Sequence, residues 1–244
     1  MSLKTGLQWY WDLTSSPSSI VDQHSGLSLG KIGTVTTIET GGPDGGPCIN
    51  CGAAAGKYRN AAVAKLPSYE SGFSINIWVY STADSSFGNW CFSHRFQNAT
   101  DPRYAHMYVR SSDDDVIGVM TLPSSSTARG DQAPLNEWQM LTGVLRNGEV
   151  ELWRNASLIG TSGFAGDLLT EPAPLSIGGN SWNTVANTFT DHRGRMAKSG
   201  VWSRPLDPEE MEVLFNEGAG RNYSDLISGS SRRRRMMMMQ RGGL

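Results

Sequence analysis

The sequence has no long apolar run and little cysteine. None of its apolar segments approaches the ~20 residues that a helix needs to cross a bilayer, which excludes a membrane-spanning helix. Three cysteines among 244 residues cannot build a disulfide framework, and the odd number leaves at least one thiol unless it pairs between chains. The opening segment MSLKTGLQWYWDL lacks a basic stretch followed by an apolar core, so we expect no secretory signal.

Recognisable catalytic and metal-binding motifs are missing as well. The sequence contains no GxSxG, no HExxH, no P-loop and no glycine pattern of a dinucleotide-binding fold. Its four histidines are scattered without the spacing of metal ligands. Cys48-x-x-Cys51 has the spacing of a redox pair or of half a zinc site. No second CxxC accompanies it, and we interpret the two cysteines as small residues near a sheet.

Charge is distributed unevenly along the chain. The last seventeen residues, 228–244, hold five of the 21 basic residues and none of the 23 acidic ones. The remainder has 16 basic and 23 acidic residues, a net charge of about −7. We therefore predict a globular body over 1–227 and a separate tail over 228–244, whose composition is typical of disorder. Only the tail suits an anionic partner.

The body reads as short strands separated by turn residues, which is typical of an all-β sandwich. The expected strands are Gln8–Leu13, Lys31–Glu39, Phe73–Ser81, Trp90–Phe96, Tyr104–Arg110, Val116–Leu122, Trp138–Arg146, Glu149–Arg154 and Arg195–Ser203. Asn147-Gly148 tolerates positive φ at both positions, so it predicts a hairpin between the two strands that flank it.

One helix is predicted, over Pro208–Glu217. Asp207 is a suitable N-cap, Pro208 fits the first helical position, and Glu210 completes a capping box. Gly218 is a suitable end. We expect this helix to pack on the rim of the sandwich.

Four segments resemble motifs of one β-sandwich family. The first is Gly72–Tyr80, which reads GFSINIWVY, and the second is Asn136–Asn155, which contains NEWQ, NG and ELWRN. The third is Pro174–Gly179, which reads PLSIGG, and the fourth is Gly200–Gly218, which contains GVWSRPLDPEEM and LFNEG. Their order and spacing resemble the laminin-G-like jelly roll of the concanavalin A-like lectin/glucanase superfamily. The resemblance spans about residues 5–226. It implies a jelly roll of two packed antiparallel sheets, one of them concave. We therefore predict an all-β jelly roll with one short C-terminal helix, followed by the basic tail.

The sequence departs from this family at two places. The family often has an acidic residue where this chain reads Arg195-Met-Ala-Lys198, which removes the ground for a metal-linked role there. Retaining glucanases of the superfamily carry a strand E-x-D-x-x-E, because their chemistry needs two carboxyl groups about 5–5.5 Å apart. No such string occurs here, and we interpret Glu149-Val-Glu151 as a solvated strand face. The second departure favours a protein that is not an enzyme.

Two of the expected strands have one apolar face and one aromatic-polar face. The predicted glycan-binding residues on the second kind of face are Trp78, Tyr104, His106, Tyr108 and Arg110. Four of them alternate along one strand, and the first lies on another strand opposite its apolar side. Aromatic rings stack on sugar faces while guanidinium and amide groups bind hydroxyls. The alternative is that loops or a partner subunit bury these aromatics.

Three consecutive carboxylates, Asp113, Asp114 and Asp115, lie between two expected strands. Related jelly rolls often hold calcium in rim loops, and Ca²⁺ prefers several oxygen ligands. The sequence therefore offers a Ca²⁺ site here. The alternative is a soluble turn.

The tail combines charge with flexible apolar side chains. The predicted partner-binding residues are Arg232, Arg233, Arg234, Arg235, Met236, Met237, Met238 and Met239. Arginine binds carboxylates through its planar fork, and methionine fills irregular grooves. We expect the tail to dock on a neighbouring protein subunit; the alternative is a disordered, solubilising end. One short cluster without interleaved aromatics argues against nucleic acid.

These observations predict a non-catalytic structural or adhesion subunit of a large assembly, such as a phage virion decoration or fibre protein, that binds glycans. A virion component leaves the cell by lysis and needs no export signal, so we expect it in a virion or outside the cell. The alternative is a stand-alone, soluble, lectin-like carbohydrate-binding protein. A glycoside hydrolase is the third hypothesis.

Overall fold

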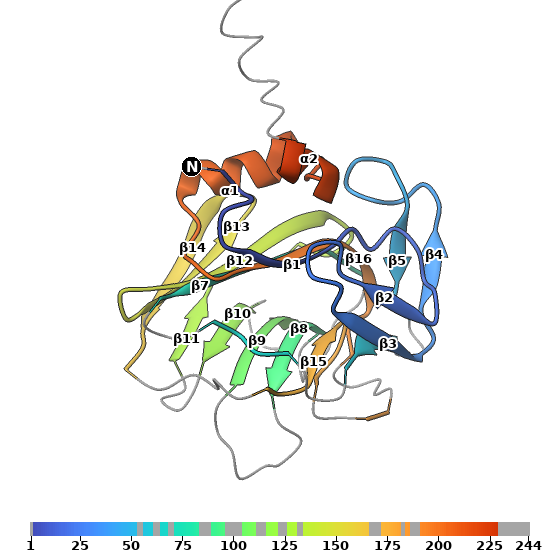
Figure 1. Ribbon diagram of the computed structural model, residues 1–244, viewed down its shortest axis with the longest axis horizontal. Helices are drawn as coiled ribbons and strands as arrows, with labels where there is room; N and C mark the ends of the chain where they lie inside the picture. The colour runs from blue at the N-terminus through green and yellow to red at the C-terminus, as the bar shows by residue number, and fades with distance from the viewer. Residues whose placement is uncertain are drawn as a thin grey trace, which may run out of the picture.

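The computed structural model is a sandwich of two antiparallel sheets, which confirms the predicted all-β jelly roll (Figure 1). The structure describes residues 2–52, 56–60, 64–67, 71–82, 89–95, 104–110, 116–121, 126–130, 134–165, 172–181, 184–185 and 191–228. For residues 104, 110 and 116–121 the backbone alone is described.

Sheet A has eight strands in the order β14-β13-β12-β7-β16-β5-β4, and β1 also pairs with β16. They are β1 Leu7–Trp11, β4 Thr36–Ile38, β5 Cys48–Asn50, β7 Phe73–Ser81, β12 Trp138–Arg146, β13 Glu149–Arg154, β14 Ser157–Gly163 and β16 Gly194–Trp202. Sheet B has the order β11-β10-β9-β8-β15-β6-β3-β2. Its strands are β2 Ser19–Val21, β3 Ser28–Gly33, β6 Gly56–Arg59, β8 Asn89–Arg95, β9 Tyr104–Arg110, β10 Val116–Thr121, β11 Ser126–Arg129 and β15 Leu175–Ile177.

The predicted hairpin at Asn147-Gly148 is confirmed. Both residues have positive φ, 49° and 76°, and Arg146 faces Glu149 at the end of the ladder between β12 and β13. The interpretation of the following strand needs correction at Glu151. This carboxylate is 9% exposed and pairs with Arg146 at 2.6 Å, so it is a buried, neutralised group and not part of a solvated face.

The prediction of one strand over Lys31–Glu39 is wrong. The chain leaves sheet B after Gly33, whose φ is 72°, and enters sheet A at Thr36. A left-handed glycine ends the first strand because an L-residue rarely adopts that conformation. The segment therefore connects the two sheets instead of extending one.

The predicted C-terminal helix forms as α1, Pro208–Phe215, and ends two residues earlier than expected. The Glu210 carboxylate accepts the backbone N–H of Asp207 at 3.1 Å, which is one half of the predicted capping box. Asn216 and Glu217 adopt positive φ, 47° and 57°, and this stops the helix before Gly218. A 3₁₀ turn, η1, covers Asn216–Gly218, and a second helix, α2, follows at Tyr223–Ser228.

Two apolar layers hold these elements together. The main core lies between the sheets and contains the inward residues of β7 and β9, such as Ile75, Ile77, Met107 and Val109. The alternation seen in the sequence places these residues correctly. A second cluster lies between sheet A and the C-terminal helices, and Leu214 of α1 belongs to it.

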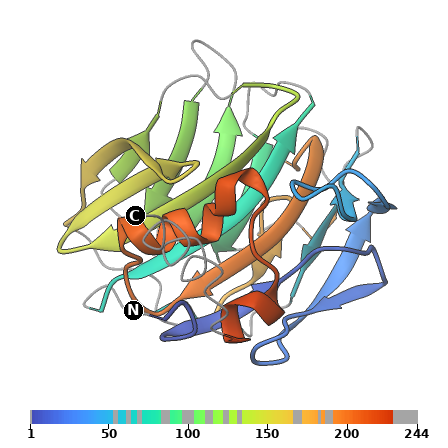
Figure 2. The same ribbon diagram turned by 90° about the horizontal axis from the view of Figure 1, so that it is seen from above.

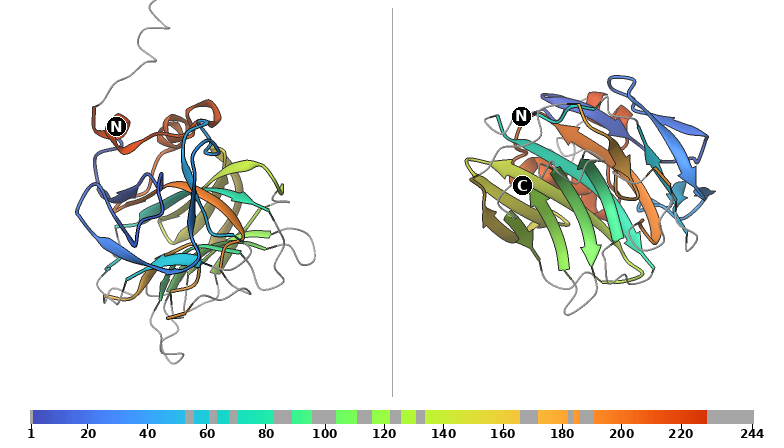
Figure 3. Two further views of the ribbon diagram at one scale, coloured as in Figure 1. Left: turned by 90° about the vertical axis from the view of Figure 1, so that its right-hand side faces the viewer. Right: turned by 90° about the horizontal axis from the view of Figure 1, so that it is seen from below.

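The helices cover one outer face of the sandwich. α1 and α2 lie across sheet A when the molecule is viewed from above (Figure 2). Seen from below, no helix of the described residues covers sheet B (Figure 3, right). The described part of the chain contains no helix with the length and apolar content for a bilayer crossing.

The cysteine pair is split between the two apolar layers. Cys48 belongs to the cluster under the helices, whereas Cys51 belongs to the core between the sheets. All three cysteines, including Cys91, are buried free thiols. Burial raises the pKa of Cys51 and Cys91 far above the usual thiol value, so both remain protonated.

Candidate functional site

The candidate site is the outer face of sheet B, where aromatic and polar side chains alternate with the core residues. One row across the sheet joins Trp90 of β8 to Tyr108 of β9, Gly118 of β10 and Arg129 of β11. Glycine carries no side chain, so β10 adds none to this row. Arg129 is exposed at the end of the row.

Three rings form a compact cluster in this row and the next. Trp90 stacks on Tyr108 with ring centroids 5.3 Å apart and an angle of 28° between the planes. His106 meets the Trp90 ring edge-on at 4.2 Å and 81°. Trp90 is half-buried, and Tyr108 belongs to neither apolar cluster although it is only 8% exposed. The cluster therefore belongs to the outer face and not to the core.

Trp90 was not among the predicted site residues, because a β-bulge reverses the direction of its side chain. Strict alternation from the core residue Phe92 would point Trp90 inward. The register shifts between Trp90 and Phe92, and both Cys91 and Phe92 face the core. A bulge inserts one residue without a partner, which turns the preceding side chain to the opposite face. No motif in the sequence marks this bulge.

His106 is a neutral ring at physiological pH. It is 1% exposed, and burial holds its pKa well below the usual histidine value. The nearby Arg95 and His94 lower the pKa further because they disfavour a second positive charge. His106 therefore supplies a neutral imidazole to the cluster, not a cation.

A tight polar turn supports the neighbouring row, which joins Arg59, Ser176, Ser93 and His106. The Ser93 Oγ lies 2.9 Å from the Ser181 Oγ and accepts the Ser181 N–H at 3.0 Å. The Arg59 Nε–H donates to the Ser181 carbonyl at 2.6 Å. These bonds hold the half-buried Arg59 guanidinium beside the outer face.

Beneath this turn lies a fully buried ion pair. The Lys57 Nζ is 3.2 Å from the Asp191 Oδ1, and both side chains are 0% exposed. A Cβ at Gly179 would lie 2.3 Å from the same Asp191 oxygen, so only glycine fits the turn. Burial lowers the pKa of Lys57, and the Asp191 carboxylate opposes that shift.

Trp78 does not belong to this site, which corrects the sequence prediction. It lies on β7 in sheet A, is 1% exposed, and stacks on Phe215 of α1 at 5.7 Å with an angle of 4°. A Cβ at Gly220 would approach its indole nitrogen to 2.9 Å. The C-terminal segment therefore covers Trp78, whereas His106 and Tyr108 lie on the other sheet.

The remaining predicted residues are described in part or not at all. Tyr104 and Arg110 occupy outward positions of β9 by register, but their side chains lie outside the described residues. Asp113, Asp114 and Asp115 lie outside them as well, as do the tail residues from Arg232 to Met239. Within the described ranges, no group of three histidine, cysteine or acidic residues has the arrangement of a metal site.

The family assignment follows from the sequence profile of the concanavalin A-like lectin/glucanases superfamily, which matches residues 54–212. The chain belongs to this superfamily. Members of the superfamily share the two-sheet jelly roll described above, and the match includes both strands that carry the aromatic cluster. No curated protein matches the chain.

Several solved structures have a similar jelly roll. Domain 4 of AbnA, a GH43 extracellular arabinanase from Geobacillus stearothermophilus in complex with arabinotriose, is 16% identical, with a TM-score of 0.59 over 85% of this chain and 97% of that one. The binding domain of Paraclostridial Mosquitocidal Protein 1 is 14% identical, with a TM-score of 0.61 over 88% and 53%. Trypanosoma rangeli sialidase is 10% identical, with a TM-score of 0.63 over 89% and 34%. The chain thus spans half of the toxin domain and a third of the sialidase, and these identities show the fold alone.

Proposed function

We propose that this jelly roll is a non-catalytic carbohydrate-binding module and that the outer face of sheet B holds the sugar. The observation that carries the proposal is the Trp90–Tyr108 stack on a face that no described helix covers. An aromatic ring packs on the C–H face of a sugar, and the guanidinium groups of Arg59 and Arg129 can donate to its hydroxyls. The similarity to an arabinanase domain in complex with arabinotriose supports this class of ligand.

Substitution of Trp90 tests the proposal. Trp90→Ala removes the half-buried platform, and we expect affinity for a glycan identified on an array to fall about tenfold, the equivalent of about 1.4 kcal/mol. Trp153→Ala is the matched control, because Trp153 is also half-buried but lies in sheet A. Binding should be measured with and without Ca²⁺. An array without hits under both conditions, or equal losses in the two variants, would contradict this site.

The charge distribution favours a setting in a larger assembly, which we propose as the second part of the function. The body has a net charge of about −7, and the tail contains five arginines. We assign ligand binding to the body and attachment to the tail. The tail then docks on an acidic and apolar surface of another subunit, and the module acts as an adhesion protein on a virion or another extracellular particle. Deleting residues 229–244 should leave the jelly roll folded and abolish incorporation into the particle. Unchanged occupancy would favour a stand-alone lectin.

A further inference from the structure

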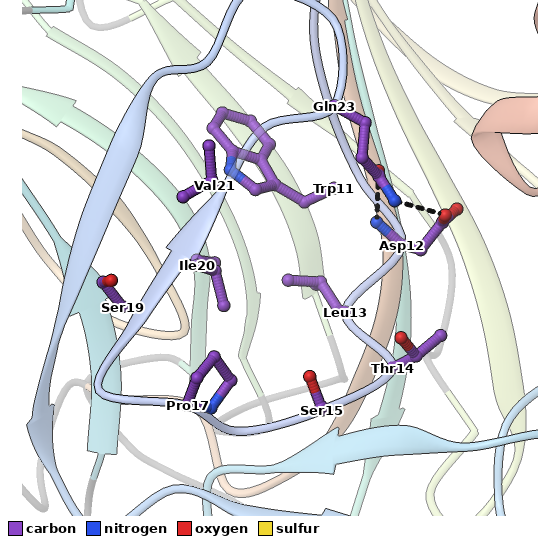
Figure 4. A pocket seen from close by; sticks show the side chains of 10 residues that line it. All are labelled: Trp11, Asp12, Leu13, Thr14, Ser15, Pro17, Ser19, Ile20, Val21 and Gln23. Carbon is purple, nitrogen blue, oxygen red and sulfur yellow. Dashed lines mark hydrogen bonds between the residues drawn. The ribbon is translucent and has the colours of Figure 1, made fainter.

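A pocket lies at the β2 edge of sheet B, away from the aromatic cluster on β8 and β9. It lies inside the loop that leaves β1 in sheet A and enters β2 in sheet B, between the two legs of that loop (Figure 4). One leg holds residues 11–14, and the other holds residues 19–23. Its volume is about 140 Å³, and its lining residues are Trp11, Asp12, Leu13, Thr14, Ser15, Pro17, Ser19, Ile20, Val21 and Gln23. A space of this size accommodates one small chemical group or part of a sugar ring.

The pocket contains a buried hydrogen-bond donor without a partner. Trp11 is 1% exposed, and its Nε1–H finds no acceptor among the described residues. Figure 4 shows this nitrogen directed toward the space between the two legs. Other tryptophans satisfy this group, since Trp138 donates to Gly41 at 2.9 Å and Trp202 donates to Leu3 at 2.7 Å. An unsatisfied buried donor is costly, so a ligand acceptor at this position would be favoured.

The lining of the pocket combines a few apolar side chains with polar ones. Leu13 and Ile20 are 4% and 7% exposed, and both belong to the core between the sheets. Val21, at the edge of the sheet, is 55% exposed. A small apolar group that enters the pocket would therefore contact carbon on two sides.

The edge of β2 supplies backbone groups for a second hydrogen bond. Among the described strands, β2 pairs with β3 alone. The bonds from Lys31 N–H to the Ser18 carbonyl and from Asp22 N–H to the Leu27 carbonyl fix the alternation of this ladder. In an antiparallel ladder the residues between bonded pairs direct their N–H and C=O groups outward. Ser19 and Val21 therefore present their carbonyl oxygens at the free edge, beside the pocket.

The charge of the lining disfavours an anionic ligand. Among the described residues that line the pocket there is no lysine, arginine or histidine. The Asp12 carboxylate is held in place by the Gln23 side chain at 2.6 Å and by the Tyr223 N–H at 3.0 Å. A fixed carboxylate without a lining cation disfavours an anionic ligand.

We infer that this pocket binds the acetamido group of an N-acetylated sugar. The acetamido carbonyl accepts the Trp11 Nε1–H, the methyl group packs against Leu13 and Ile20, and the amide N–H donates to a carbonyl at the edge of β2. No other common substituent of a sugar combines an acceptor, a donor and a methyl group within this volume. The inference does not depend on the proposed site at Trp90, which lies on a different part of the sheet.

Titration of the ¹⁵N-labelled full chain with N-acetylglucosamine, glucose and glucosamine tests the inference. The three probes differ at one substituent: acetamido, hydroxyl and ammonium. The Trp11 indole signal, assigned by its loss in Trp11→Phe, should move downfield and saturate with N-acetylglucosamine alone. An indole signal that stays in place up to the solubility limit of the sugar would overturn the inference. An equal shift with glucose, or a stronger one with glucosamine, would do so too.

A pair of surface variants tests the same pocket if Trp11→Phe does not fold. Ser15 is exposed on the rim and lines the pocket, so Ser15→Phe fills the space without changing the core. Ser18 is equally exposed but does not line the pocket, so Ser18→Phe is the matched control. Affinity for N-acetylglucosamine should fall at least about tenfold in the first variant and stay unchanged in the second. Equal affinities in both variants would place the sugar elsewhere and refute the pocket.

Discussion

The two outer faces of the sandwich differ in what covers them. On sheet A, Trp78 lies beneath Phe215, and apolar residues of the helices complete the layer. On sheet B, Trp90 and Tyr108 lie among serine and arginine side chains, with no helix of the described residues above them. The same jelly roll thus covers one outer face with helices, and the proposed sugar site lies on the other. An aromatic residue at an outward strand position takes its role from what packs over it.

The largest expected effect is acid destabilisation, which originates in three buried histidines, two of them on strands of sheet B. His94, His106 and His192 are fully buried with lowered pKa values, about 4 for the first and the last. Below about pH 6.5 the unfolded chain binds protons that the native state does not bind. Stability is therefore present above that pH and falls as pH decreases, by up to about 4 kcal/mol per pH unit for three groups.

Urea unfolding at a series of pH values between about pH 8 and pH 5 measures this effect. We expect a steep loss of unfolding free energy below about pH 6.5. Single His→Gln variants at the three positions should each reduce the slope by about one third, if they fold. An unfolding free energy that stays constant over this range would show that these histidines are accessible to protons in the native state.

The second prediction compares one substitution on both faces. Trp78→Ala empties a buried site under α1 and should cost about 3–5 kcal/mol. Trp90→Ala removes a half-buried ring and should cost about 1 kcal/mol, the average for a point substitution. Urea midpoints of both variants give the difference. Equal costs would mean that the two outer faces are covered alike, and the contrast between them would be lost.

The third prediction concerns the ion pair under the polar turn. Lys57→Met removes the Lys57 cation from the buried Asp191 carboxylate and should cost about 3–5 kcal/mol. The double variant Lys57→Met/Asp191→Leu removes both charges, and we expect it to recover most of that stability. Thermal or urea unfolding of the single and double variants measures the coupling. A double variant as unstable as the single one would show that the pair contributes packing and not charge compensation.

Part of the fold and part of the candidate site could be predicted from the sequence. Alternation along β7 and β9 correctly separated inward residues such as Ile75 and Met107 from outward ones, and family motifs indicated the sandwich. Alternation carries no information about the layer that covers a sheet. Trp78 and Tyr108 were therefore both predicted to bind glycans. The site also depends on a bulge at Cys91, which points Trp90 outward. The pocket at Trp11 arises from the path of a loop between sheets, which no local pattern encodes.

The smallest expected effect concerns the pH dependence of sugar binding on sheet B. His106 contacts Trp90 edge-on, and its pKa is held well below the usual value by burial, with Arg95 and His94 adding to the shift. The ring therefore stays neutral between about pH 6.5 and pH 8, where an ordinary histidine would begin to gain a proton. Glycan affinity measured by calorimetry should change less than about twofold over this range. A larger loss toward the acid end, absent in His106→Gln, would mean that the ring titrates and that the outer face of sheet B is more open to water than the aromatic cluster indicates.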